Sequence, residues 1–324
     1  MPGLAIVLSG GGAKGAFQVG VLDELVTQRG VKFDIFAGVS TGAIQALGGA
    51  MNDIPGLMKV WSEIKGNGDI YKKRTFGVVE GLFGAPSLFT AKPLRDKLTA
   101  FANPAKLKAA KRTLRVGVVS LARGQYLDID GTNPNIADWV YASCAQPPAF
   151  PPLETKDPIT GVVEQWVDGG VRNVAPLSPV MKLKPTRVLV VLAAPPKPVP
   201  EPGKQYDSLL EIALRSVGIQ TAEIVANDVG NAMLVNDLIA AREAQFHKLT
   251  DLGLSPANVG LALRPLDDHL ARFDFAPIRL IAPPMGFDAP ETLEFKPAKI
   301  AAAIAEGQRV AKEQWPMIKA FLGV

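Results

Sequence analysis

The chain has 324 residues, of which 48% are hydrophobic and 20% are charged, so it is long enough for one large α/β domain and too apolar for general disorder. Its net charge is +4, but 13 Lys/Arg against 4 Asp/Glu between Lys59 and Arg115 give that segment +9 and leave −5 for the remainder. This basic segment suits peripheral contact with an anionic membrane, and it does not by itself indicate nucleic acid, which we do not expect as a partner.

Cys144 is the single cysteine, which excludes an intramolecular disulfide and fits a reducing compartment. The apolar run near the N-terminus leads directly into a glycine-rich turn and follows no charged residue, so it predicts a core strand rather than a signal peptide. No uncharged apolar run reaches the roughly 18 residues of a membrane-spanning helix. We therefore expect a cytoplasmic protein, with membrane contact limited to its surface.

The first fifty residues alternate between strand and helix patterns. Apolar runs at 4–8 and 35–39 predict strands, and helical spacing follows each of them, from Phe17 to Leu25 and from Thr41 to about Met51. This βαβ order predicts an α/β fold with parallel strands and a right-handed crossover.

Residues 52–112 are less regular and hold the basic cluster, so we expect an insertion or cap with short helices there. Further strands are predicted at 114–121, 126–129, 164–167, 188–192, 259–263 and 278–281, and further helices at 136–145, 207–249 and 297–322. No linker separates two domains. We expect one domain over 1–324, with a motif-bearing core at about 4–195 and a helical C-terminal extension at about 205–324.

Three glycine motifs carry the functional prediction. Ser40 lies in Gly38-Val39-Ser40-Thr41-Gly42, between a strand and a helix, which is the context of a nucleophile elbow. The earlier turn Gly10-Gly11-Gly12-Ala13-Lys14-Gly15 also joins a strand to a helix, and its unobstructed N–H groups are suited to an oxyanion. Because both turns follow neighbouring parallel strands, we expect them at one edge of the sheet.

A serine nucleophile also needs a base, which is usually a histidine, and the only histidines of the chain are His247 and His269. Neither follows a strand with turn residues around it. Asp168 is the better candidate, because it ends an apolar strand and is followed by Gly169 and Gly170. Partial burial would raise the pKa of this carboxyl above its ordinary value of about 3.9 and allow it to accept the serine proton.

Together these motifs resemble the patatin-like phospholipase family, and the stretch from Ala142 to Pro147 is similar to that family's block between nucleophile and aspartate. The resemblance covers about residues 4–195. It implies a three-layer fold with a central, mostly parallel sheet, a Ser40–Asp168 dyad, a glycine-rich oxyanion hole, no metal or cofactor, and cleavage of acyl esters of lipids. Lys14 stands at the family's basic position after the oxyanion glycines.

Two alternatives remain at this point. Gly10, Gly12 and Gly15 also fit the GxGxxG pattern of a dinucleotide-binding loop, although Asp34 begins the second strand instead of ending it. The same dyad would equally support transfer of an acyl group to an alcohol other than water. The sequence does not separate hydrolysis from transfer.

Overall fold

The computed structural model describes residues 3–74, 84, 86–271 and 275–324. Its centre is an eight-stranded sheet in the order β10-β9-β1-β2-β5-β8-β7, with β6 paired to β5. The strands are β1 (Leu4–Leu8), β2 (Ile35–Gly38), β5 (Thr113–Ser120), β6 (Tyr126–Asp130), β7 (Leu153–Lys156), β8 (Val163–Asp168), β9 (Arg187–Val191) and β10 (Ile278–Ile281). The five strands from β10 to β5 run parallel, whereas β6, β7 and β8 pair antiparallel.

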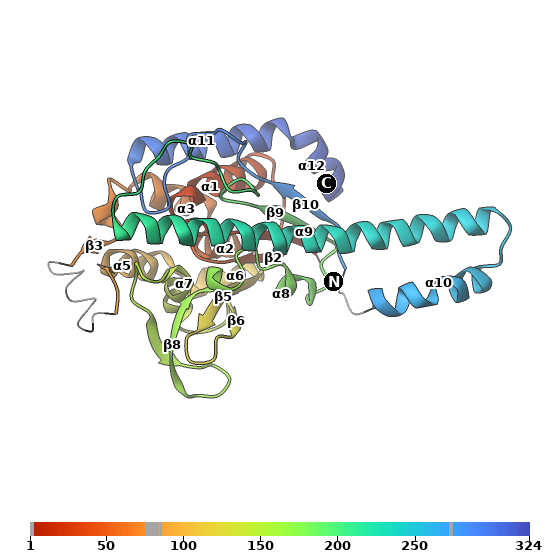
Figure 1. Ribbon diagram of the computed structural model, residues 1–324, viewed down its shortest axis with the longest axis horizontal. Coiled ribbons are helices and arrows are strands. Elements are labelled where there is room, and N and C mark those ends of the chain that lie inside the picture. Colours follow the sequence, from red (N-terminus) through yellow and green to blue (C-terminus); the bar gives the residue numbers. More distant parts are fainter. Residues whose placement is uncertain (1–2, 75–83, 85, 272–274) are drawn as a thin grey trace.

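Helices cover both faces of this sheet, as Figure 1 shows. One face bears α1 (Ala16–Leu22), α2 (Thr41–Ala50), α3 (Ile54–Ser62), α5 (Lys92–Phe101), α7 (Ile136–Cys144), α11 (Pro297–Glu313) and α12 (Trp315–Leu322), and α6 (Pro104–Ala110) lies beside them. The other face bears α8 (Leu177–Met181) and the first half of α9 (Leu209–Asp251). This confirms the predicted three-layer α/β fold.

Alternation along the strands explains why two cores form. In β1, Ile6 and Leu8 belong to the core under α1 and α2, whereas Ala5 and Val7 belong to the core under α8 and α9. Successive side chains of a strand point to opposite faces, so an all-apolar strand is buried on both sides. The fully apolar runs of the sequence are therefore its central parallel strands.

Two predictions about elements were wrong. Residues 259–263, predicted as a strand, lie in helix α10 (Pro256–Leu270), which begins where the Ser255 side chain accepts a hydrogen bond from Asn258 N. Helix propensity and this cap outweigh a short apolar run that has no sheet edge to join. The predicted helix 297–322 is two helices, α11 and α12, and Pro316 stands in the first turn of the second.

The described part of the segment 52–112 packs with the rest of the fold. It contains α3, α5, α6, the short turn η3 (Asn67–Asp69) and the two-stranded pair β3 (Lys72–Lys73) and β4 (Phe89–Thr90). Trp61, Tyr71 and Phe89 are buried in the same core as the sheet, and the rings of Tyr71 and Phe89 lie 4.7 Å apart. A basic helical cap is therefore not confirmed. Phe76 and Phe83 lie outside the described residues.

Candidate active site

Ser40 stands at a strained turn between β2 and α2. Its φ of 56° and ψ of −131° place a non-glycine residue at positive φ, a conformation that costs about 1–3 kcal/mol and is concentrated at functional sites. The flanking glycines make the turn possible, because a Cβ atom on Gly38 would lie 2.1 Å from Gly42 O and one on Gly42 would lie 2.2 Å from Leu8 O. The backbone thus presents the Ser40 side chain at the N-terminus of α2.

The first glycine turn lies beside Ser40, at the carboxyl end of the adjacent parallel strand β1. Gly10 N donates to Val174 O at 3.1 Å, so that amide is already used. The amides of Gly11 and Gly12 have no acceptor among the hydrogen bonds of the described residues. Gly12 has φ of 58°, and a Cβ atom there would lie 2.1 Å from Thr292 O, which explains the need for glycine.

Asp168 ends β8 and is 1% exposed. Its Oδ1 accepts a hydrogen bond from Gly170 N at 2.7 Å, and its Oδ2 is buried with no partner in the described part of the chain. Burial raises the pKa of Asp168 to about 7, while the Gly170 N–H and the nearby Ser40 side chain oppose that rise. Although Ser40 is close enough to affect this pKa, no hydrogen bond of regular geometry joins the two side chains.

The position of Asp168 follows from an antiparallel strand. β8 pairs with only the last part of β5, and Asp168 lies opposite Val118. The last residue of a parallel strand would lie at the carboxyl edge of the sheet, beside Gly10 and Ser40. The last residue of the antiparallel β8 still lies close to that edge, because β8 pairs only with the last three residues of β5 and ends there. The sequence predicted that Asp168 ends a strand, but the direction of that strand was not predicted.

Helix α7 contacts both candidate residues through its C-terminal end. The fully buried Ser143 hydroxyl donates to Gly117 O at 2.7 Å and accepts from Ser40 N at 2.9 Å. One residue beyond the end of α7, Ala145 O accepts from Asp168 N at 3.1 Å. The block 142–147 was recognised from the sequence, but no role was predicted for Ser143. The one sign of such a role in the sequence was a hydroxyl group among small apolar residues.

A cavity of about 760 Å³ opens between these groups. It is lined by Ser40 and Asp168, and by Gly10, Gly11, Gly12, Lys14 and Gly170 of the predicted set. Gly15, Gly38, Gly42 and Gly169 do not line it. They shape the surrounding backbone instead; Gly15, for example, packs against Thr41 and Gln45.

The cavity walls divide by polarity. One part is apolar and aromatic, formed by Val60, Trp61, Ile64, Ile70, Leu94, Leu98, Phe101, Phe150 and Phe295. The other part holds Lys14, Glu201, Lys204, Arg215 and Glu291. Burial lowers the pKa of Lys14, and the carboxylates of Glu291 and Glu201 partly counteract this effect. The lining of the cavity thus combines an apolar, aromatic surface with a cluster of paired charges.

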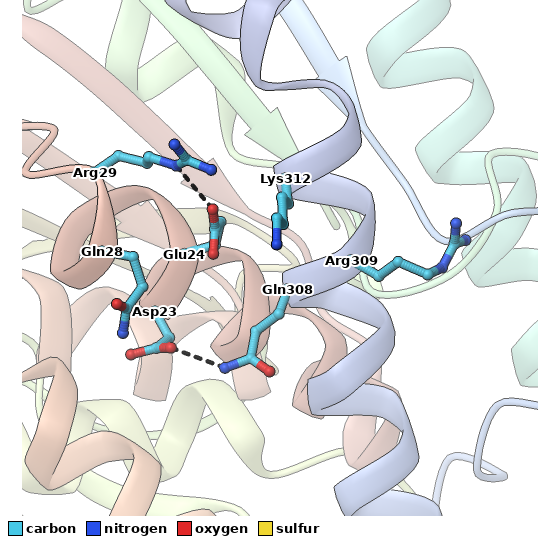
Figure 2. A pocket seen from close by; sticks show the side chains of 7 residues that line it. All are labelled: Asp23, Glu24, Gln28, Arg29, Gln308, Arg309 and Lys312. Atoms are coloured by element: carbon cyan, nitrogen blue, oxygen red, sulfur yellow. Dashed lines mark hydrogen bonds and ion pairs between the residues drawn. The ribbon is translucent and has the colours of Figure 1, made fainter.

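A second pocket, shown in Figure 2, lies where α11 meets the helical turn η2 (Asp23–Gln28). Its charges are largely paired: Arg29 Nε lies 2.8 Å from Glu24 Oε1, and Gln308 Nε2 donates to Asp23 Oδ2 at 2.8 Å. It contains no glycine turn and no strained serine. We assign it no part in the chemistry of Ser40.

Other candidates from the sequence lie elsewhere or are unsuited. His247 on α9 and His269 on α10 do not line the cavity. Cys144 lines it, but burial raises the pKa of its thiol well above the ordinary value, which disfavours the nucleophilic thiolate. The Asp34 carboxylate accepts from Leu4 N at 3.1 Å, at the opposite end of β1 from the glycine turn, where it does not serve a dinucleotide ribose.

The described residues contain neither a metal site nor a membrane-spanning helix. Among them, no group of three or more His, Cys, Asp or Glu side chains has the arrangement of a metal site. None of their helices combines the length and hydropathy needed to cross a bilayer.

Comparisons with known proteins identify two similar proteins and one protein family. The chain is 31% identical over 201 residues to triacylglycerol lipase 4 of Saccharomyces cerevisiae (strain ATCC 204508 / S288c), a match that covers 54% of this chain and 22% of the yeast protein. The chain thus spans less than a quarter of that relative. VipD from Legionella pneumophila, known from a crystal structure, aligns over 98% of this chain and 67% of its own with a TM-score of 0.41 and 14% identity. A model of patatin-like phospholipases matches residues 6–181, more than half of the chain, and the chain therefore belongs to the patatin-like phospholipase family.

Proposed function

We propose that this protein is a lipid acyl hydrolase in which Ser40 is the nucleophile and Asp168 its general base. Membership of the patatin-like phospholipase family and the similarity to a triacylglycerol lipase support acyl ester hydrolysis. The observation that carries the residue assignment is that a serine at a strained turn and a buried carboxyl with a pKa of about 7 line one cavity.

In the first half of the reaction, Asp168 accepts the proton of the Ser40 hydroxyl while the oxygen attacks the ester carbonyl. The amides of Gly11 and Gly12 are the donors for the resulting oxyanion, because they have no acceptor of their own in the described structure. The positive end of α2 stabilises the same charge. Protonated Asp168 then gives its proton to the leaving alcohol, and an acyl ester of Ser40 forms.

In the second half, Asp168 takes a proton from water, whose oxygen attacks the acyl group. Asp168 then returns that proton to the departing Ser40 oxygen, which releases the free fatty acid and restores the Ser40 hydroxyl. The pKa of Asp168 suits both roles, because a group that titrates near neutral pH serves as base and then as acid. The apolar walls at Trp61, Leu94 and Leu98 are placed to hold the acyl chain during both steps.

The test is hydrolysis of p-nitrophenyl esters and of phospholipid vesicles by wild type, Ser40→Ala and Asp168→Asn. We expect both variants to lose at least about a thousand-fold in kcat, since each removes a group that acts in every turnover. A fluorophosphonate probe should label wild type at Ser40 alone. Full activity in either variant, or labelling of a different serine, would remove that residue from the mechanism.

A further inference from the structure

The second half of α9 and helix α10 form a hairpin that extends beyond the sheet and its covering helices (Figure 1). We call residues 230–271 the protruding hairpin. All of them are described, and Val259 is the only one that is buried. Yet 21 of these 42 residues are apolar, the same proportion as in the whole chain. A segment with the composition of a folded domain thus buries almost none of its own side chains.

Its exposed apolar residues are large and lie along its length. Leu234 and Leu238 are separated by one helical turn, with Ala241 at the next, so all three lie on one face of α9. Leu234 is 57% exposed, Leu252 at the turn between the helices 70%, and Leu261 on α10 68%. Several large apolar side chains left exposed on one segment favour an interaction site there.

The hairpin is a preformed unit. Arg242 on α9 makes two hydrogen bonds to Asp267 on α10, both at 2.7 Å, from Nε to Oδ1 and from Nη2 to Oδ2. This paired geometry fixes the relative position of the two helices. The exposed leucines of the two helices therefore keep their relative positions without a binding partner.

Charge argues against an anionic lipid surface as the partner. The protruding hairpin has Arg242, Lys248 and Arg264 against five acidic residues, a net charge of −2. The basic excess of the chain lies in the segment 59–115. Docking on anionic lipid would place the acidic part of the protein against the membrane, and electrostatics oppose that arrangement.

A second copy of the chain would cover the same surface by apolar packing and not by charge, since the hairpin of each copy carries −2. Two helical hairpins packed face to face form a four-helix bundle, which buries the apolar faces that one hairpin leaves exposed. The α9 part of the hairpin is about 33 Å long and α10 is about 22 Å long, and each helix is about 10 Å wide. The face therefore offers on the order of 550 Å² per copy, or about 1,100 Å² in total, which exceeds the roughly 1,000 Å² expected of a specific interface.

We propose that the protruding hairpin is a homodimerisation element, through which two copies associate about a two-fold axis. The same helix, α9, lines the cavity earlier in its course with Thr221, Ala222 and Val225. Dimerisation would thus restrain the helix that forms one wall of the candidate active site. This inference does not depend on the assignment of Ser40 or Asp168.

The test compares the mass in solution of the full-length wild type with that of the double variant Leu234→Glu/Leu238→Glu, by light scattering after size exclusion. We expect wild type at twice 34.4 kDa and the variant at 34.4 kDa. The matched control is Ile159→Glu/Val162→Glu, which changes two exposed apolar residues near the β7–β8 turn and should leave the dimer intact. Ester hydrolysis and circular dichroism confirm that each variant is folded.

A monomeric wild type at micromolar concentration would overturn the proposal, as would a dimer that survives both glutamates. If the wild type is monomeric and binds vesicles of phosphatidylcholine and phosphatidylglycerol, and the double variant does not, the surface is a lipid contact and the proposal is wrong. Should the glutamates reduce helix content, Leu234→Ser/Leu238→Ser makes the same comparison with a smaller perturbation.

Discussion

The carboxyl group of Asp168 determines how the reaction should respond to pH. Its pKa of about 7 lies above the ordinary aspartate value because burial disfavours the charged form. The base must be deprotonated to accept the Ser40 proton, so kcat/KM should rise with pH up to about 7 and then level off. Below pH 7 it should fall close to ten-fold per pH unit.

The measurement is kcat/KM for a soluble p-nitrophenyl ester between pH 5 and 9, because this ratio reports the titration of the free enzyme. Thermal unfolding at each pH provides the control for loss of folded protein. A rate that stays constant from pH 5 to 9 would show that no group with a pKa near 7 acts as the base, and would exclude the role proposed for Asp168.

Ser143 gives a second prediction for a single residue. Ser143→Ala leaves the partly buried Ser40 amide without its acceptor, at a cost of up to about 1–3 kcal/mol. Because that amide belongs to the strained turn, we expect kcat to fall about ten- to a hundred-fold with little change in KM. Ser143→Thr, which keeps a hydroxyl, should recover part of the loss.

The matched control for Ser143 is Ser120→Ala. Ser120 is also a fully buried serine, but its hydroxyl donates to Glu164 Oε2 at 2.6 Å, away from Ser40. Both alanine variants should lower the melting temperature, and only Ser143→Ala should lower kcat. Equal kcat values in the two variants would show that Ser143 contributes to stability alone.

At the scale of residues, the sequence predicted those positions whose type is imposed by local geometry. Gly38 and Gly42 could be recognised because the turn at Ser40 leaves no room for a Cβ atom two residues before or two residues after it. Ser143 could not, because its contacts to Ser40 N and Gly117 O join residues that are 103 and 26 positions away. Pairing across such distances leaves no periodic signal in the chain.

At the scale of elements, the central parallel strands β1, β2 and β9 were predictable because each is an apolar run buried on both faces. Strand β7, with its sequence Leu-Glu-Thr-Lys, was missed because it lies at the sheet edge and carries polar residues. Residues 259–263 were assigned to a strand because a short apolar run fits strand and helix equally. The cap at Ser255 and the packing of α10 against α9 decide for the helix.

The apolar walls contributed by α3 and α5 lead to a prediction on chain length. Val60, on α3, is half-buried and lines the cavity, so Val60→Trp should fill part of the space for the acyl chain. We expect kcat/KM for long-chain p-nitrophenyl esters to fall at least about ten-fold, while the acetate ester is hydrolysed nearly as before.

Met58→Trp is the control, since Met58 is half-buried on the same helix but does not line the cavity. It should leave the ratio between long-chain and acetate esters unchanged. Unchanged hydrolysis of the long-chain esters by Val60→Trp would mean that the acyl chain occupies another part of the cavity, and an equal loss for both esters would mean that the substitution does not act through the acyl chain.

For the whole molecule, the distribution of charge separates two surfaces. The segment 59–115 carries +9, whereas the protruding hairpin carries −2. Several of the basic side chains in that segment are already paired, such as Lys92 with Asp96 at 2.6 Å and Arg95 with Asp138 at 3.1 Å. Lys72 and Lys73 of β3 are exposed and follow Ile70, which lines the cavity. The basic surface therefore borders the candidate active site.

This arrangement predicts that anionic lipid recruits the protein through Lys72 and Lys73. Lys72→Gln/Lys73→Gln should weaken binding to vesicles containing phosphatidylglycerol by up to about thirty-fold at low salt, since each cation near such a surface contributes about 1 kcal/mol. Hydrolysis of a soluble ester should not change, because neither side chain lines the cavity. Co-sedimentation with vesicles at several salt concentrations measures the effect, and Lys319→Gln, on α12, is the control. If the double variant and wild type bind anionic vesicles equally and with the same dependence on salt, these lysines do not form the membrane contact, and the basic excess of this segment has another role.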